Sequence, residues 1–195
     1  MNLRVKLARA RLALQPINKG LQTFHKVKID PTQGATIADA YDAAEHQPNN
    51  PDVIKAYKAF NDETVQQYDE MIDNGLKITK LKEGDTGYAT SQEMHDDILN
   101  NNHISYFPSE QGFGQDTGGD HPMLGVSGRF DGENSMPYND VFRIVHDVNG
   151  HNLGDLSDFS PEGEHQAFLT HKQQYSPLAQ KAMFTETAGQ ANWGA

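Results

Sequence analysis

Helix-start signals recur along this 195-residue chain and constrain its fold more than any other feature. Asn50-Pro51, Ser160-Pro161 and Ser176-Pro177 each place a polar capping side chain before a proline, a residue that the first turn of an α-helix favours. The first signal precedes a helical spacing of apolar residues that predicts one long helix over about 51–74. The other two predict helices near the C-terminus, the second of them ending near Gly189.

Shorter elements fill the middle of the chain. Thr90-Ser-Gln-Glu93 has the spacing of a capping box and predicts a helix that runs to Leu99. Residues 78–81 and 103–107 are typical of short strands. The segment 108–135 holds seven glycines and predicts a long irregular stretch, which we expect to form a lid over a site. The fold class is therefore mainly α with a few short β-strands.

A further helix is predicted from a cap at Asn139 or Asp140 to His151. Its core face follows helical spacing and is formed by Val141, Ile144, Val145 and Val148. His146 and His151 flank the opposite side, so both faces of this helix have a role.

The charge of −11 is unevenly distributed along the chain. Residues 1–29 hold seven Lys or Arg and no acid, which leaves nine basic against 27 acidic residues in 30–195. We therefore predict a basic N-terminal arm and an acidic, mainly helical domain that repels nucleic acid and anionic membranes. The arm itself could bind either of these or an acidic surface of a partner, or it packs as a terminal helix on its own domain.

Targeting signals and cysteines are both missing from the sequence. No apolar run reaches membrane-spanning length, and the first 14 residues interleave basic and apolar positions, unlike a signal peptide. We therefore expect a protein that is not secreted by that route. Without cysteine, a metal would be held by nitrogen and oxygen ligands alone.

The two histidines of His146-Asp-Val-Asn-Gly-His151 are the strongest candidates for metal ligands. Their five-residue spacing separates side chains on an ideal α-helix by about 140°, so the pair can chelate only at a helix end or a distortion. Gly150 supplies a reason to expect such a distortion. From spacing alone, two solvated or core histidines are an equal alternative.

These residues also carry a resemblance to a known family. Met136-Pro-Tyr-Asn-Asp140, leading into His146-Asp-Val-Asn-Gly-His151, resembles the iron-binding helix of the aromatic amino acid hydroxylases, and Phe184-Thr185-Glu186 is similar to the context of their third ligand. The resemblance implies Fe(II) at His146, His151 and Glu186, with Zn or Mn as alternatives for such a ligand set. It also implies that Arg129 holds the substrate carboxylate. No upstream segment matches the family's pterin-binding region.

A second resemblance covers the whole chain. The His-Asp-x-x-Gly-His helix, Ser160-Pro-Glu-Gly-Glu164 and Thr185-Glu-Thr-Ala-Gly-Gln190 are similar to segments of uncharacterised proteins of tailed bacteriophages. It implies that the protein acts in the cytoplasm of an infected host or in a virion.

Other polar residues compete for the predicted site. Glu164 can replace Glu186 as the carboxylate ligand, serve as a general base, or merely favour the start of its helix. With His171 it can also build a second metal position or orient the two ligand histidines. Asp147 is expected beside the metal as a catalytic residue. Four other histidines have no comparable partners in the sequence, and most of them are expected on the surface or in loops: His95, His103, His121 and His165.

Two hypotheses of function follow from the sequence. The first is a mononuclear non-haem iron protein, an oxygen-dependent hydroxylase-like enzyme acting on a small or aromatic substrate. A hydrolytic metal enzyme is a variant of it. The second is a non-catalytic virion or assembly protein with the same helical body, which docks onto other virion proteins through residues 1–29. An accessible pocket beside the metal ligands would favour the enzyme.

Overall fold

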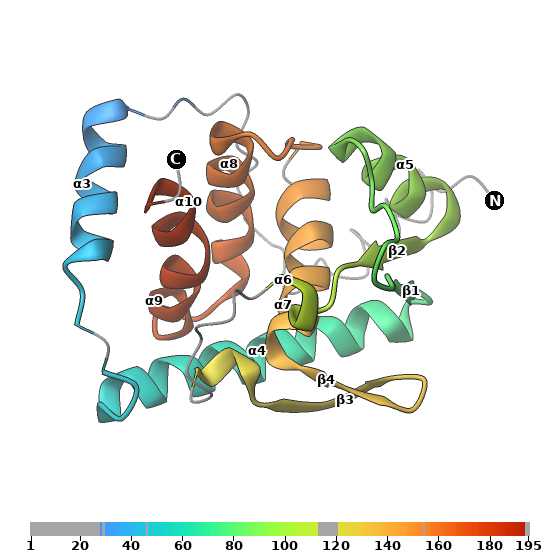
Figure 1. The fold of residues 1–195 in the computed structure, drawn as a ribbon, viewed down its shortest axis with the longest axis horizontal. Helices are drawn as coiled ribbons and strands as arrows, with labels where there is room; N and C mark the ends of the chain where they lie inside the picture. The colour runs from blue at the N-terminus through green and yellow to red at the C-terminus, as the bar shows by residue number, and fades with distance from the viewer. Residues whose placement is uncertain (1–27, 29, 46, 113–120, 154, 194–195) are drawn as a thin grey trace.

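The computed structural model describes residues 28, 30–45, 47–112, 121–153 and 155–193. Its longest element is helix α4 (Pro51–Asp73), which begins as predicted with Asn50 as the N-cap, its Oδ1 accepting from the backbone N–H of Asp52 at 2.9 Å. Figure 1 shows α4 running beneath the other helices. Two helices pack on it, α7 (Tyr138–His146) and α9 (Ala179–Phe184). The predicted basic arm, 1–29, lies outside the described residues except for Lys28.

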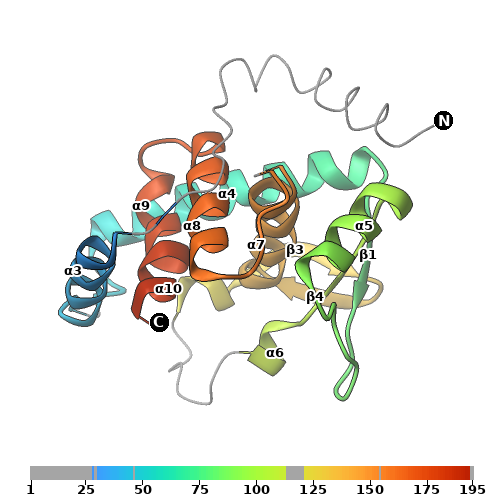
Figure 2. The ribbon, with the colours of Figure 1, turned by 90° about the horizontal axis from the view of Figure 1, so that it is seen from above.

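The C-terminal third is almost entirely helical. Its elements follow one another closely and have these bounds: α7, the π-helix η2 (Asp147–Asn152), α8 (Pro161–His171), the 3-10 turn η3 (Lys172–Gln174), α9, the π-helix η4 (Thr185–Gly189) and α10 (Gln190–Trp193). At the other end of the described chain, α3 (Pro31–Asp42) packs against α10 (Figure 2). The helices therefore bring both ends of the described chain to the same side of the molecule.

Two small sheets complete the fold. β1 (Lys77–Lys80) and β2 (His103–Tyr106) pair in parallel, on either side of α5 (Ser91–Asn101) in the sequence. α5 starts at the predicted cap, since the backbone N–H of Glu93 donates to Thr90 Oγ1 at 3.3 Å. The protein is thus mainly helical with short strands, as the sequence predicts.

The prediction of one irregular segment over 108–135 was wrong for most of its described part. The chain there forms α6 (Ser109–Gly112), the 3-10 turn η1 (Pro122–Leu124) and an antiparallel hairpin of β3 (Val126–Asp131) and β4 (Asn134–Pro137). Gly132 has a φ of 60°, which the tight hairpin turn requires. Residues 113–120, where a lid was expected, lie outside the described residues.

The helix that carries the histidines is anchored on its apolar side. Val141, Ile144 and Val145 are fully buried, which confirms the predicted core face. The predicted cap at Asn139 or Asp140 was wrong, because the N-cap is Pro137 and α7 starts two or three residues earlier than predicted, at Tyr138. Asp140 instead accepts a hydrogen bond from the backbone N–H of Ser109 at 2.7 Å, which ties α6 to α7. Within the described part of the chain, no helix is both long and apolar enough to cross a membrane.

Candidate metal centre

The backbone changes from α- to π-helix immediately after His146, at η2. The N–H of Leu153 donates to the carbonyl of Val148, five residues earlier, at 3.2 Å. One turn therefore takes about one residue more than in an α-helix, and residues five apart lie nearly above one another. The rings of His146 and His151 consequently lie with centroids 5.2 Å apart and planes at 79°. This is the distortion that the five-residue spacing required.

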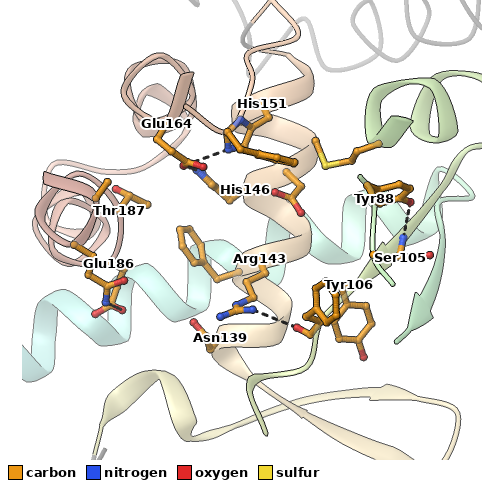
Figure 3. A pocket seen from close by; sticks show the side chains of 18 of the residues that line it. Tyr88, Ser105, Tyr106, Asn139, Arg143, His146, His151, Glu164, Glu186 and Thr187 are labelled. Carbon is orange, nitrogen blue, oxygen red and sulfur yellow. Dashed lines mark hydrogen bonds and ion pairs between the residues drawn. The ribbon is translucent and has the colours of Figure 1, made fainter. Parts of the chain in front are cut away.

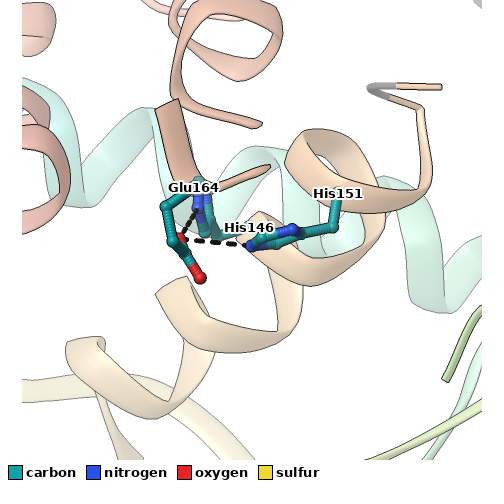
Figure 4. A group of neighbouring side chains, drawn as sticks. All are labelled: His146, His151 and Glu164. Carbon is teal, nitrogen blue, oxygen red and sulfur yellow. Dashed lines mark ion pairs between the residues drawn. The ribbon is translucent and has the colours of Figure 1, made fainter. Parts of the chain in front are cut away.

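Glu164 completes the cluster from the neighbouring helix α8. That helix starts at the predicted Ser160 cap, whose Oγ accepts from the N–H of Gly163 at 3.1 Å. Glu164 Oε2 then lies 3.7 Å from His146 Nε2 and 3.3 Å from His151 Nε2 (Figure 4). The three ligand atoms all lie within 4.8 Å of one another.

These separations suit a metal ion. Two ligand atoms with bonds of about 2.0–2.2 Å that meet at about 90–109° are about 2.8–3.6 Å apart, as in octahedral or tetrahedral sites. The two measured distances to Glu164 Oε2, 3.3 and 3.7 Å, are close to that range. His146 Nε2 is also buried with no hydrogen-bond partner among the described residues, which leaves its lone pair free for a metal.

A chain of hydrogen bonds sets the tautomer of His146. His171 is fully buried, and burial holds its pKa well below the usual value, so the ring is neutral. Its Nε2–H donates to Gln67 Oε1 at 3.0 Å, an oxygen that also accepts from Asn149 Nδ2 at 2.8 Å. His171 Nδ1 is therefore an acceptor, and His146 Nδ1–H donates to it at 3.0 Å. The lone pair of His146 is thereby placed on Nε2, facing Glu164.

His151 is oriented in the same way by a backbone carbonyl. Its Nδ1 lies 3.3 Å from the carbonyl oxygen of Ser157, and His95 Nε2 lies 3.1 Å from the same oxygen. The Nε2 atom of His151 is left facing Glu164. His95 is thus one of the four other histidines that does not lie on the surface, because it is 1% exposed and helps to fix the Ser157 carbonyl.

The charges of the cluster influence one another strongly. Burial alone would raise the pKa of Glu164, but the contacts with His146 and His151 outweigh it and hold that pKa well below its usual range. Burial likewise opposes the charge on His151, yet the Glu164 and Asp147 carboxylates raise its pKa overall. Asp147, the predicted catalytic residue beside the metal, has a pKa raised chiefly by burial. The site therefore holds an ionised carboxylate, that of Glu164, beside a carboxyl group that is harder to ionise, that of Asp147.

The predicted ligand Glu186 is not part of this cluster; the structure brings Glu164 to the histidines instead. Glu186 lies in η4 and accepts a hydrogen bond from the hydroxyl of Tyr57. Its Oε1 is 3.5 Å from Nε2 of His121, a histidine for which the sequence pattern indicated no partner. Burial raises the pKa of Glu186 to about 7, although the hydrogen bond from Tyr57 acts in the opposite direction.

A cavity of about 890 Å³ connects the cluster with Glu186. Figure 3 shows the side chains of α7, α8 and η4 that line it. The lining combines charged residues with aromatic ones: His146, Asp147, His151, Glu164, Glu186, Arg143, Tyr41, Tyr88, Tyr106, Phe107, Phe142 and Phe159. The side chain of Glu164 is 33% exposed, so the cluster is open to this space.

The arginine of the cavity is Arg143, and Arg129 does not line it. The Nε and Nη2 atoms of Arg129 both donate to the carboxylate of Asp69. The Arg129 side chain, from β3, is therefore already paired with a residue of α4. The prediction that Arg129 holds a substrate carboxylate is therefore not supported by its position. Arg143 lies on the predicted metal-binding helix between the core stripe and the histidines, a position that could have been read from its helical spacing.

Comparisons with protein-family models, with curated proteins and with solved structures find no match to this chain.

Proposed function

We propose that the protein binds one divalent metal ion through His146 Nε2, His151 Nε2 and the carboxylate of Glu164. The observation that carries this proposal is the convergence of three ligand atoms within 4.8 Å, with both imidazoles oriented by hydrogen bonds at Nδ1. Orientation of ligand histidines through their second nitrogen is typical of metal sites in proteins. Two imidazoles and a carboxylate are the ligand set of mononuclear non-haem iron enzymes, and they also accept zinc or manganese.

We further propose that the site is catalytic and acts on a small molecule in the adjoining cavity. A structural metal site is closed by protein ligands, whereas these three ligands leave coordination positions free toward a cavity of about 890 Å³. With iron bound, such positions supply the oxygen chemistry of hydroxylases, which agrees with the resemblance of this helix to the aromatic amino acid hydroxylases. The aromatic walls exclude water and fit an apolar or aromatic group.

Two charged residues of the cavity have roles in this proposal. Arg143 points into the cavity and donates a long hydrogen bond of 3.5 Å to the carbonyl of Phe107, so it is placed to bind an anionic group of the substrate. Asp147 adjoins the ligand His146 and lines the same space, where its carboxyl can hold a proton. In a hydrolytic enzyme Glu164 would be a ligand, which leaves Asp147 as the general base.

The alternative of a non-catalytic assembly protein depends on residues 1–29, which the structure does not describe apart from Lys28. The open cavity beside the cluster favours the enzyme.

Metal content tests the proposal directly. Elemental mass spectrometry on untagged protein is expected to find about one metal ion per chain. His146→Ala should lose it, whereas His165→Ala, which changes a histidine of α8 outside the cluster, should retain it. Iron would direct the search to dioxygen and aromatic substrates, and zinc to hydrolysis. A parent protein without metal after incubation with iron, zinc and manganese would contradict the proposal.

A further inference from the structure

Glu186 is a buried carboxylate that the metal cluster does not use. Its side chain is 3% exposed, yet it lines the cavity (Figure 3). Oε1 accepts the hydrogen bond from Tyr57, and Oε2 has one long contact of 3.5 Å with Nε2 of Gln190. Oε2 is therefore the less satisfied of the two oxygens.

The nearest histidine does not supply a positive charge to Glu186. The backbone N–H of Met123 donates to Nδ1 of His121 at 3.2 Å, so that nitrogen carries a lone pair. His121 is then neutral with its hydrogen on Nε2, which faces Glu186 Oε1. Among the residues that the structure describes, no lysine or arginine forms an ion pair with Glu186.

A buried carboxylate without a cation is unfavourable, because burial removes its hydration. It can take up a proton, or it can receive a cation from a ligand. The ring of Tyr41 favours the second, since it lines the cavity beside the helix of Glu186. Tyr41 packs closely on that helix: a Cβ at Gly189 would lie 2.7 Å from Tyr41 Cδ2. An aromatic face and a carboxylate together bind ammonium groups well.

We propose that Glu186 and Tyr41 form a binding site for a protonated amine, at a different place in the cavity from the metal ligands. The proposal rests on the proposed function in one respect, namely that a small molecule occupies this cavity. The amine donates a hydrogen bond to Glu186 Oε2 and lies against the ring of Tyr41. The rest of the ligand then extends along the aromatic walls toward His146, His151 and Glu164.

The test uses benzylamine as a probe and benzyl alcohol as its uncharged counterpart. Calorimetric titrations at about pH 8, where the amine is protonated, are made on full-length protein both metal-free and metal-loaded. We expect benzylamine to bind at least about tenfold more tightly than benzyl alcohol in both forms. Glu186→Gln should abolish that preference and Tyr41→Leu should reduce it several-fold, whereas Glu162→Gln, an exposed acid on α8, should leave it unchanged.

Three results would overturn the amine site. One is equal binding of the two probes, and another is a preference that persists in Glu186→Gln. The third is a preference seen only with metal bound, since the amine would then be coordinating the metal. The metal content of Glu186→Gln separates this proposal from the proposed function: retained metal with an unchanged preference contradicts the amine site alone. Lost metal would instead make Glu186 a ligand and also contradict the amine site.

Discussion

Gly150 lies directly against the imidazole ring of His146. A Cβ at position 150 would be 2.9 Å from both Cε1 and Nδ1 of that ring, and 3.3 Å from the Cβ of Ala167. The glycine therefore does more than permit the π-helical turn. It provides the space in which the His146 ring lies between η2 and α8.

Gly150→Ala is expected to displace His146 and weaken metal binding by about 10- to 100-fold. In an ordinary helix interior the same change would stabilise the protein by about 1 kcal/mol, but here overpacking should cost about 1–3 kcal/mol. Metal titration and urea unfolding measure the two effects. Gly34→Ala, in α3 at the edge of the molecule, is the matched helical control. Parental metal affinity in Gly150→Ala would show that the ring can move without loss.

Glu164→Gln and Glu186→Gln separate the two candidate carboxylates. Glu164→Gln should weaken metal binding by more than about 100-fold, because an amide is a poor ligand compared with a carboxylate. Glu186→Gln should bind metal like the parent, since the Glu186 carboxylate faces Tyr57 and is not part of the cluster with His146 and His151. Competition with a chelator measures both affinities. If Glu186→Gln weakened metal binding more than Glu164→Gln did, Glu186 would be the ligand.

His171→Leu removes the acceptor that holds the His146 tautomer. We expect metal affinity to fall by about 10- to 100-fold, because the Nε2 lone pair of His146 would no longer be fixed toward Glu164. Thr170→Val is the control, since this buried neighbour bonds only the carbonyl of Gln166 within its own helix. Circular dichroism should confirm that both variants are folded. Unchanged affinity in His171→Leu would mean that packing alone orients the ring.

Glu186 should make the metal-free protein less stable as the pH rises. Its pKa is raised from 4.5 to about 7 in the folded protein, so the native state binds more protons than the unfolded state between these values. Stability contributed by the protonated form is thus lost as the pH rises from about 4.5 to about 7, by an amount on the order of 3 kcal/mol.

Glu186→Gln cannot ionise and should escape this loss. Urea unfolding at pH 8 should therefore find it more stable than the parent, whereas the two should be nearly equal at pH 4.5. Glu162→Gln provides the comparison for removing an exposed carboxylate. An equal effect of Glu186→Gln at both pH values would show that folding does not raise the pKa of Glu186.

Local signals in the sequence predicted the helix starts well. The caps at Asn50, Thr90 and Ser160 act within one turn of the chain, so they can be recognised without knowledge of the tertiary structure. The hairpin of β3 and β4 was missed because glycine-rich sequence also fits an irregular loop. Its register depends on pairing between strands, such as Arg129 with Met136.

The choice of ligand could not be made from local signals. Glu164 and Glu186 both follow a helix start, and which of them faces His146 depends on how α8 and η4 pack against α7. Arg129 was assigned to the substrate from the family resemblance, and its pairing with Asp69 could not be recognised locally because the two residues lie 60 positions apart in the sequence. His171 was recognised as a candidate because it shares a helical face with Glu164, which is again a local relation.

Because of the π-helical turn, the histidine pair depends on the number of residues between His146 and His151. Deleting any one residue between His146 and His151 would bring the histidines to the spacing of a regular helix and remove the need for the wide turn. The deletion would also rotate every residue after it by about 100° relative to α7, so that the connection to α8 would have to be rebuilt. Insertions and deletions within η2 should therefore be far less tolerated than a conservative substitution of the half-buried Val148, and a library of single-residue deletions across 147–150 would measure that intolerance.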